Sequence, residues 1–185
     1  MRMVVALACL LGLLGAIPAH AAESKDVFGR EVPVGQGRPT LMLYANRGTS
    51  EQLRAHAFDF AYELREERPI VVVQVDLRDV PGLFRGTARK EIRRRHHESL
   101  DFMRQLFHEQ GQQPPADLEE SLFMVADSKG KSHRELGLPK GFNQVFAKAL
   151  SPSGEELASG PFPDAARELE KAIEAATHAS LASVE

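Results

Sequence analysis

The fold is decided by one stretch of the chain, LMLYANRGTSEQL at residues 41–53. Its apolar first half predicts a buried strand, and its polar second half predicts a turn and a helix with Thr49 or Ser50 as N-cap. A helix that begins directly after a strand presents free N–H groups and the positive end of its dipole. A cysteine placed there has a lowered pKa and becomes a reactive thiolate. Here Gly48 stands at the junction, so the sequence predicts a fold more clearly than a reaction.

The segments around this stretch alternate between strand and helix. An apolar strand is predicted over 40–45, a helix over 48–68 that Pro69 ends, and a β-branched strand over 70–75. Both strands are almost continuously apolar, which is typical of strands covered on both faces. We therefore predict a parallel pair joined by a right-handed helical crossover.

The rest of the chain continues the α/β pattern and ends in a hairpin and a helix. The predicted elements are an opening hairpin over 26–34, an irregular segment over 77–86, a helix over 87–109, a strand over 121–126, a short helix over 131–136, hairpin strands over 144–150 and 156–159, and a final helix over 163–176. The prediction is an α/β fold with a central mixed sheet, a parallel βαβ unit, and a C-terminal β-hairpin plus helix.

The N-terminus has the pattern of a cleaved secretory signal. Arg2 precedes an apolar run over 4–17, and Ala19-His20-Ala21 fits the small-x-small cleavage rule. The run is shorter than the roughly 20 residues that span a bilayer, which disfavours a transmembrane anchor. We expect a periplasmic or secreted protein that meets the membrane only through this segment. The expected organisation is a signal peptide over 1–21, a single domain over 22–178, and a frayed tail over 179–185.

Composition excludes several classes of function. The formal net charge of the 185-residue chain is −3, which gives no electrostatic footprint for nucleic acid. The single cysteine is Cys9, inside the segment that we expect to be removed. Disulfides, thiolate catalysis and cysteine metal ligands are therefore excluded for the processed protein. We expect no cofactor.

The order of elements resembles that of the thioredoxin superfamily, and is most similar to its extracytoplasmic peroxiredoxin-like and TlpA-like branch. The resemblance is carried by the opening hairpin, the first core strand, a D-x-x-G stretch that precedes Gly-Leu, and the turn of the C-terminal hairpin, at residues 26–32, 37–45, 125–138 and 150–155. It implies a three-layer thioredoxin-like fold around a mixed sheet. It also implies a redox site, whose cysteines this chain lacks.

The resemblance locates the degenerate site at the strand-to-helix junction. In the peroxiredoxin-like and TlpA-like patterns, the reactive cysteine corresponds to Gly48, directly before the run 49–51. The family also places a cis-proline before the hairpin strand, at the position of Val145, and Pro139 is too early to supply it. The resemblance thus implies a possible binding groove between the Gly48 region and Val145.

The junction itself offers candidates for binding and for hydrolysis. Free N–H groups beside Gly48, together with Arg47, suit a carboxylate or another anion. Asn46, Thr49 and Ser50 are further binding candidates, but the simpler interpretation is a helix cap with a permissive glycine before it. A nucleophilic Ser50 needs a histidine, and His56 is predicted to face away from it on the same helix. A Glu51–Asp76 carboxylate pair is a further candidate, although nothing in the sequence sets its separation.

The helix over 87–109 carries two other candidate sites. His97, Asp101 and His108 lie near one helix face, where they would hold zinc or copper weakly, but a solvated face is the simpler interpretation. The basic cluster over 90–97 suits an acidic partner or anionic lipid, although neighbouring acidic residues balance its charge.

These observations leave hypotheses of different classes. The first is a non-catalytic thioredoxin-like module that binds an envelope protein or peptide at the groove. The second is a redoxin-type oxidoreductase or antioxidant protein that acts without cysteine. The third is a weak histidine-based metal carrier.

Overall fold

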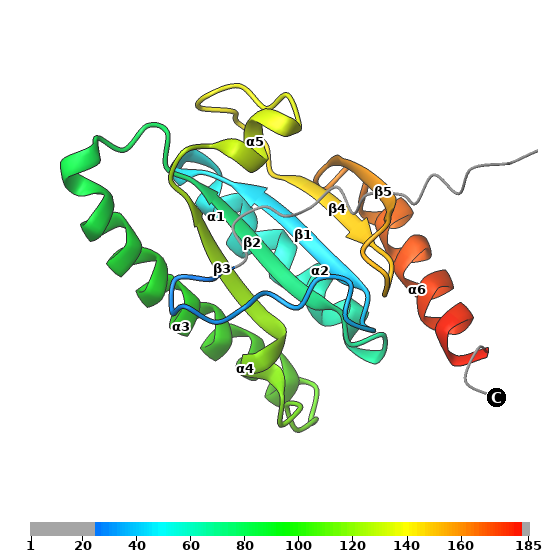
Figure 1. Ribbon diagram of the computed structural model, residues 1–185. Helices are drawn as coiled ribbons and strands as arrows, with labels where there is room; N and C mark the ends of the chain where they lie inside the picture. Colours follow the sequence, from blue (N-terminus) through cyan, green and yellow to red (C-terminus); the bar gives the residue numbers. More distant parts are fainter. Residues whose placement is uncertain (1–24, 183–185) are drawn as a thin grey trace, which may run out of the picture.

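A five-stranded mixed sheet forms the centre of the protein, with the strand order β3-β2-β1-β4-β5 (Figure 1). The computed structural model describes residues 25–182, so the predicted signal peptide and residues 183–185 lie outside the described part. The strands are β1 (Thr40–Ala45), β2 (Ile70–Asp76), β3 (Leu122–Asp127), β4 (Phe146–Leu150) and β5 (Glu156–Pro161). The predicted bounds of β1 are confirmed, and those of the other strands are close.

The register of the strands confirms the predicted βαβ unit. β1 pairs in parallel with β2, with Leu41 opposite Val71 and Leu43 opposite Val73. β2 pairs in parallel with β3, whereas β4 is antiparallel to both β1 and β5. Because parallel strands end at the same edge of a sheet, the segments that follow β1, β2 and β3 meet at one edge, where α/β folds commonly bind ligands.

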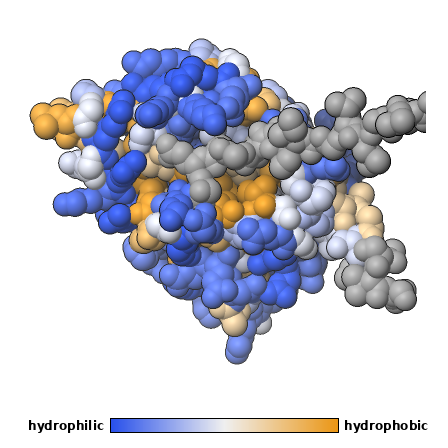
Figure 2. Space-filling model, in the orientation of Figure 1, coloured by the Kyte–Doolittle hydropathy of each residue, from blue (hydrophilic) through white to orange (hydrophobic). Residues whose placement is uncertain are grey.

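The helices are divided unequally between the two faces of the sheet. The larger hydrophobic core packs Leu41, Leu43 and Val73 against helices on one face. The opposite face carries Met42 and Tyr44 and is covered by the segment 25–39 and by α5 (Figure 1). Figure 2 shows apolar residues at the middle of this face, framed by hydrophilic ones. The helices are α1 (Ser50–Gln52), α2 (Phe58–Glu63), α3 (Arg85–Glu109), α4 (Leu118–Ser121), α5 (Lys131–Glu135) and α6 (Ala166–Ala182).

This arrangement is the three-layer thioredoxin-like fold that the resemblance implied. A parallel βαβ unit is followed by an antiparallel hairpin, and α6 packs on the same sheet face as α2 and α3. The assignment rests on strand order, strand direction and the side of the sheet on which each helix lies.

The first helix is interrupted, where the sequence predicted a continuous helix over 48–68. A 3₁₀ turn at Arg47–Thr49 leads into α1, a π-helical turn spans Leu53–Ala57, and a 3₁₀ turn at Leu64–Glu66 follows α2. The π turn keeps both Leu53 and Ala57 buried. Sequence periodicity misses such a turn because one extra residue shifts the helical phase only locally.

The opening hairpin predicted over 26–34 is wrong. One isolated bridge between Lys25 and Glu31 is present in its place. The carboxylate of Asp26 accepts hydrogen bonds from the N–H groups of Phe28 and Arg30, which bends the chain into a turn. The N–H of Val27 then donates to the carbonyl of Met124 at 2.9 Å, so this segment is fastened to β3 rather than to itself.

The final helix also differs from its predicted range of 163–176. A turn delays its start to Ala166, since the N–H of Ala165 donates to the carbonyl of Pro161. The helix then continues to Ala182, and its last turn contains the strong helix formers Ala179, Leu181 and Ala182.

We predict that Leu43→Ala lowers the free energy of unfolding by about 2–5 kcal/mol, because a fully buried side chain on the central strand leaves a cavity. The matched control is Leu157→Ala on β5, where the side chain is 42% exposed and the expected change is within about 0.5 kcal/mol. Urea unfolding followed by circular dichroism measures both values. Equal losses in the two variants would contradict this placement of the core.

Candidate functional site

Asn46 caps the helix that follows β1. Its Oδ1 accepts hydrogen bonds from the N–H groups of Gly48 at 2.6 Å and Thr49 at 3.1 Å, while its own N–H donates to Oγ1 of Thr49 at 2.9 Å. Thr49 precedes α1 but forms no side-chain cap there, and Ser50 lies inside α1, so the capping side chain is that of Asn46 rather than the predicted Thr49 or Ser50. The chain itself satisfies the N–H groups that the anion hypothesis required.

Side chains at the helix start also bind the loop before β4. Nδ2 of Asn46 donates to the carbonyl of Phe142 at 2.6 Å, and Oε1 of Gln52 accepts from the N–H of Val145 at 2.8 Å. Val145 is fully buried, and its carbonyl accepts from the N–H of Phe162 at 2.8 Å. The structure thus places Val145 in the core beneath the junction, where Gln52 bridges it to the first helix.

The junction lacks the marks of a thiol redox site. Position 48 is glycine, and a Cβ added there would lie 3.2 Å from Oδ1 of Asn46. Among residues 25–182 the one cis peptide bond joins Phe162 to Pro163, so the bond before Pro139 is trans. Cys9, the single cysteine of the sequence, lies outside the described residues.

The predicted site residues divide into a buried support and an exposed surface. Asn46 and Thr49 are buried, whereas Arg47, Gly48, Ser50 and Glu51 are exposed. The exposed residues form one continuous surface because they lie on the same two turns of the helix start. We call this surface the junction face.

The catalytic pairs considered for hydrolysis are not formed. Oγ of Ser50 donates to the carbonyl of Arg47 at 3.0 Å, and within residues 25–182 no hydrogen bond joins Ser50 to His56. Asp76 is almost fully buried and forms a 2.7 Å ion pair with Arg78, and within residues 25–182 no hydrogen bond joins it to Glu51. The geometry that a nucleophile or a carboxylate pair requires is absent from the described junction.

A buried aspartate–histidine pair lies behind the junction. Oδ2 of Asp127, at the end of β3, accepts from Nδ1 of His133 in α5 at 2.9 Å. Burial works to raise the pKa of Asp127, but hydrogen bonds from the His133 ring and from the N–H groups of His133 and Lys131 outweigh it and hold the pKa below its usual value. His133 packs against Tyr44 and Phe142, each with ring centroids 5.5 Å apart. Since neither member reaches solvent, the pair supports the fold rather than transferring protons to a substrate.

A large pocket opens beside the junction, between the first helix and α3. Its volume is about 620 Å³, within the roughly 300–1,000 Å³ typical of small-molecule sites. The floor is formed by the ends of the parallel strands, and the walls by the first helix, the segment before α3, and α3 itself. The apolar lining residues are Ala45, Leu53, Phe58, Val73, Val75, Leu77, Val80, Phe84, Ala88, Ile92, Phe102 and Met124.

Charged side chains also line this pocket. Arg47 and Arg54 come from the first helix, and Glu91, Arg95 and Glu98 come from α3. Glu91 and Glu98 both form ion pairs with Arg95, and both also pair with Arg94 of the same helix. In contrast, no residue in 25–182 forms an ion pair with Arg47 or Arg54. The first-helix wall therefore carries excess positive charge.

Sequence reasoning missed this pocket, because its lining comes from segments that only the fold brings together. One local signal was present, the apolar pair Leu83-Phe84 after Pro81-Gly82 in a segment predicted to be irregular. Leu83 is 88% exposed and Phe84 is 56% exposed. Figure 2 shows hydrophobic residues projecting at the end of the molecule where α3 begins. Phe84 lines the pocket directly.

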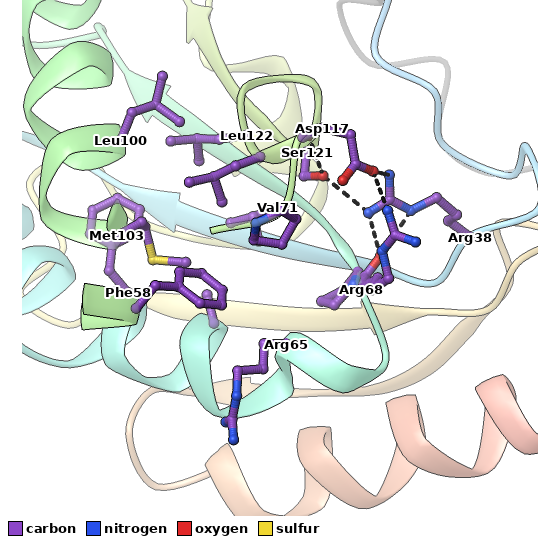
Figure 3. Close-up of a pocket in the computed structure, with 15 residues that line it drawn as sticks. Arg38, Phe58, Arg65, Arg68, Val71, Leu100, Met103, Asp117, Ser121 and Leu122 are labelled. Atoms are coloured by element: carbon purple, nitrogen blue, oxygen red, sulfur yellow. Dashed lines mark hydrogen bonds and ion pairs between the residues drawn. The ribbon is translucent and has the colours of Figure 1, made fainter. Parts of the chain in front are cut away.

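A second pocket, at the opposite edge of the sheet, is structural. Figure 3 shows Phe58, Val71 and Leu122 in its apolar lining and an arginine–aspartate network on one side. Arg68 pairs with Asp117 at 2.7 Å, and Arg38 approaches the same carboxylate at 3.4 Å. Its volume of about 50 Å³ is far below that of ligand sites, so this pocket is a packing gap between helices and sheet.

The weak metal hypothesis is not supported. Residues 25–182 contain no group of three or more His, Cys, Asp or Glu side chains placed to hold a metal ion. His97 packs against Phe28 with ring centroids 5.6 Å apart, and Asp101 pairs with Arg104 at 2.9 Å. His108 lies about three helical turns after His97 on α3.

The basic cluster over 90–97 is largely engaged within the protein. Arg93 donates to the carbonyl of Val27 at 2.7 Å, and Arg94 and Arg95 pair with glutamates of α3. Its charge is thus balanced locally, which favours a solvated surface over a docking site for an acidic partner or lipid. None of the described helices is both long enough and apolar enough to cross a membrane.

Comparisons with known proteins concern the fold alone. No family model matches the sequence, and no curated protein matches it. StoA from Bacillus subtilis is 12% identical, with a TM-score of 0.49 over 80% of this chain and 92% of that one. A putative thiol:disulfide interchange protein DsbE from Chlorobium tepidum is 14% identical, with a TM-score of 0.49 over 83% and 90%. A putative thioredoxin from Neisseria meningitidis is 16% identical, with a TM-score of 0.44 over 80% and 85%.

We predict that Asn46→Ala lowers the free energy of unfolding by about 1–3 kcal/mol, because it removes the cap and leaves the buried Phe142 carbonyl unpaired. Ser50→Ala, four residues on, removes an exposed hydroxyl and is expected to change stability by less than about 0.5 kcal/mol. Thermal or urea unfolding compares the two variants. A loss for Ser50→Ala as large as that for Asn46→Ala would contradict the assignment of the cap.

We predict that Asp127→Asn reduces stability at neutral pH and flattens its acid dependence. A carboxylate whose folded pKa is lowered contributes stability that is present above its unfolded pKa of about 3.9 and is lost as the pH falls through the folded value. The wild type should therefore lose more stability than Asp127→Asn between neutral pH and about pH 3. Urea unfolding across this range measures the difference, with exposed Asp59→Asn as control. Parallel curves for wild type and Asp127→Asn would refute the prediction.

Proposed function

We propose that this protein is a cysteine-free, non-catalytic thioredoxin-like module that binds an envelope protein or peptide through the junction face. The observation that carries the proposal is the set of hydrogen bonds that hold the junction face in place. Asn46 and Gln52 lock the helix start to the loop before β4 through buried or partly buried hydrogen bonds. Recognition surfaces are precise when neighbouring side chains hold them rigid.

The residues of the junction face suit contact with a partner better than chemistry. Arg47 offers a charged group with planar hydrogen-bonding geometry, and arginine is enriched at the energetic centres of protein interfaces. Gly48 leaves room for close approach of another chain. Ser50 and Asp76, by contrast, are engaged in internal contacts that leave no activated nucleophile or base.

We further propose that the protein acts in the periplasm or outside the cell. The pattern at residues 1–21 supports export, and the absence of cysteine from residues 22–185 suits an oxidising compartment. The junction face would then meet partners in the cell envelope.

The first test measures location and activity together. Protein recovered from the periplasm of an expressing bacterium is expected to begin at Ala22. It is expected to show no insulin reduction and no peroxide consumption, because the processed chain holds no thiol. Thiol-independent turnover that survives purification would overturn the non-catalytic assignment, and an intact N-terminus would overturn the export assignment.

The second part of the test locates the binding surface. A photo-activatable amino acid in place of Arg47 is expected to cross-link a protein or peptide in the envelope. The matched control is the same amino acid in place of Arg167, which is exposed on α6 and is not part of the junction face. Equal labelling from both positions, or labelling from position 167 alone, would contradict the junction face as the binding surface.

A further inference from the structure

The pocket between the first helix and α3 leaves apolar core side chains facing open space. Val75 is only half-buried, although Gln74 and Asp76, its neighbours on β2, are buried. Ala88 and Phe102 of α3 are half-buried for the same reason, since they line the pocket. Water in such a space finds few hydrogen-bond partners, so an apolar group that displaces it gains free energy.

The wall of the pocket contains the π-helical turn Leu53–Ala57. Turns of this kind inside α-helices are rare and often occur at functional sites. Both Leu53 and Arg54, the first residues of this turn, line the pocket. The turn therefore presents an apolar and a cationic side chain to the same space.

The charges of the pocket favour an anionic ligand group at the first helix. Glu91 and Glu98 on the α3 wall are paired with Arg94 and Arg95. On the facing wall, Arg47 and Arg54 form no ion pair with any residue in 25–182. A carboxylate matches arginine because it accepts two hydrogen bonds from one guanidinium.

We propose that this pocket binds a small amphipathic carboxylate, with an aliphatic chain in the apolar interior and the carboxylate at Arg47 and Arg54. This inference goes beyond partner binding at the junction face, because the ligand is a small molecule held between the helices. Arg47 is shared by the two sites, whereas Ala88 and the strand ends belong to the pocket alone.

The ligand class is tested with three probes of equal chain length, dodecanoate, dodecanol and dodecylammonium, added to the delipidated protein in isothermal titration calorimetry. Dodecanoate is expected to bind more tightly than dodecanol by on the order of tenfold, because it adds charged hydrogen bonds. Dodecylammonium is expected to bind most weakly, because its charge repels both arginines. Equal affinities for the three probes, or binding of none, would overturn the proposal.

Variants test the position of the ligand. Ala88→Trp and Thr87→Trp each place a large side chain at the pocket and are expected to abolish binding of dodecanoate. The matched control is Lys90→Trp, at an exposed position of the same helix that does not line the pocket. Circular dichroism identifies the variants that fold. Binding unchanged in a folded pocket variant would overturn the proposal.

A double variant, Arg47→Ser with Arg54→Ser, tests the carboxylate contact. It is expected to weaken dodecanoate by on the order of tenfold and to leave dodecanol unchanged, with Arg167→Ser as the exposed control. An equal loss for both probes would overturn the role of the arginines. Photo-cross-linking from position 47 in Ala88→Trp separates the two proposals, since partner capture should persist there while dodecanoate binding is lost.

Discussion

The hydrogen bonds of Asn46 connect the three parts of the structure on which the site depends. One side-chain oxygen caps the helix start, and the side-chain nitrogen of the same residue holds the loop before β4 through Phe142. The end of β1, the first helix and the hairpin loop thus share one buried amide. An amide in this position satisfies backbone groups that would otherwise be free, and unpaired buried polar groups are costly. The cap therefore explains why the junction is stable and also why its N–H groups are not offered to an anion.

The cap formed by Asn46 changes the interpretation of Gly48, because the N–H groups at this helix start are already hydrogen-bonded within the protein. A cysteine at a helix N-terminus has a lowered pKa and becomes reactive, but here position 48 is glycine and Asn46 occupies the nearest N–H groups. What remains at the C-terminal edge of the parallel strands is an exposed surface with a large apolar pocket beside it. Such edges commonly bind ligands in α/β folds.

The two faces of the sheet are stabilised in different ways. Helices α2, α3 and α6 bury one face through a continuous apolar core. The segment 25–39, which has little regular structure, covers part of the other face and relies on Arg30. This guanidinium stacks over Phe123 at 4.7 Å and donates to the carbonyl of Leu122 at 3.0 Å, while Asp26 pairs with it at 2.7 Å. The buried Asp127–His133 pair holds α5 on the same face. Polar networks thus supplement the smaller apolar cluster on this face of the sheet.

The sequence alone was enough to predict the parallel strands, the chain order of the five strands of the sheet and the absence of a cysteine at position 48. Runs such as 40–45 and 70–75 are almost continuously apolar, and a buried strand of this kind can be recognised without knowing its partner strands. The sequence likewise shows, without any knowledge of the fold, that residues 10–185 contain no cysteine. Tertiary structure decided which residue caps the helix, because Asn46, Thr49 and Ser50 are all good N-cap residues, and their bonds depend on where the first turn begins. It also decided the position of the large pocket. The residues that line this pocket lie between Ala45 and Met124 in the sequence, and no local sequence pattern encodes how they pack against one another.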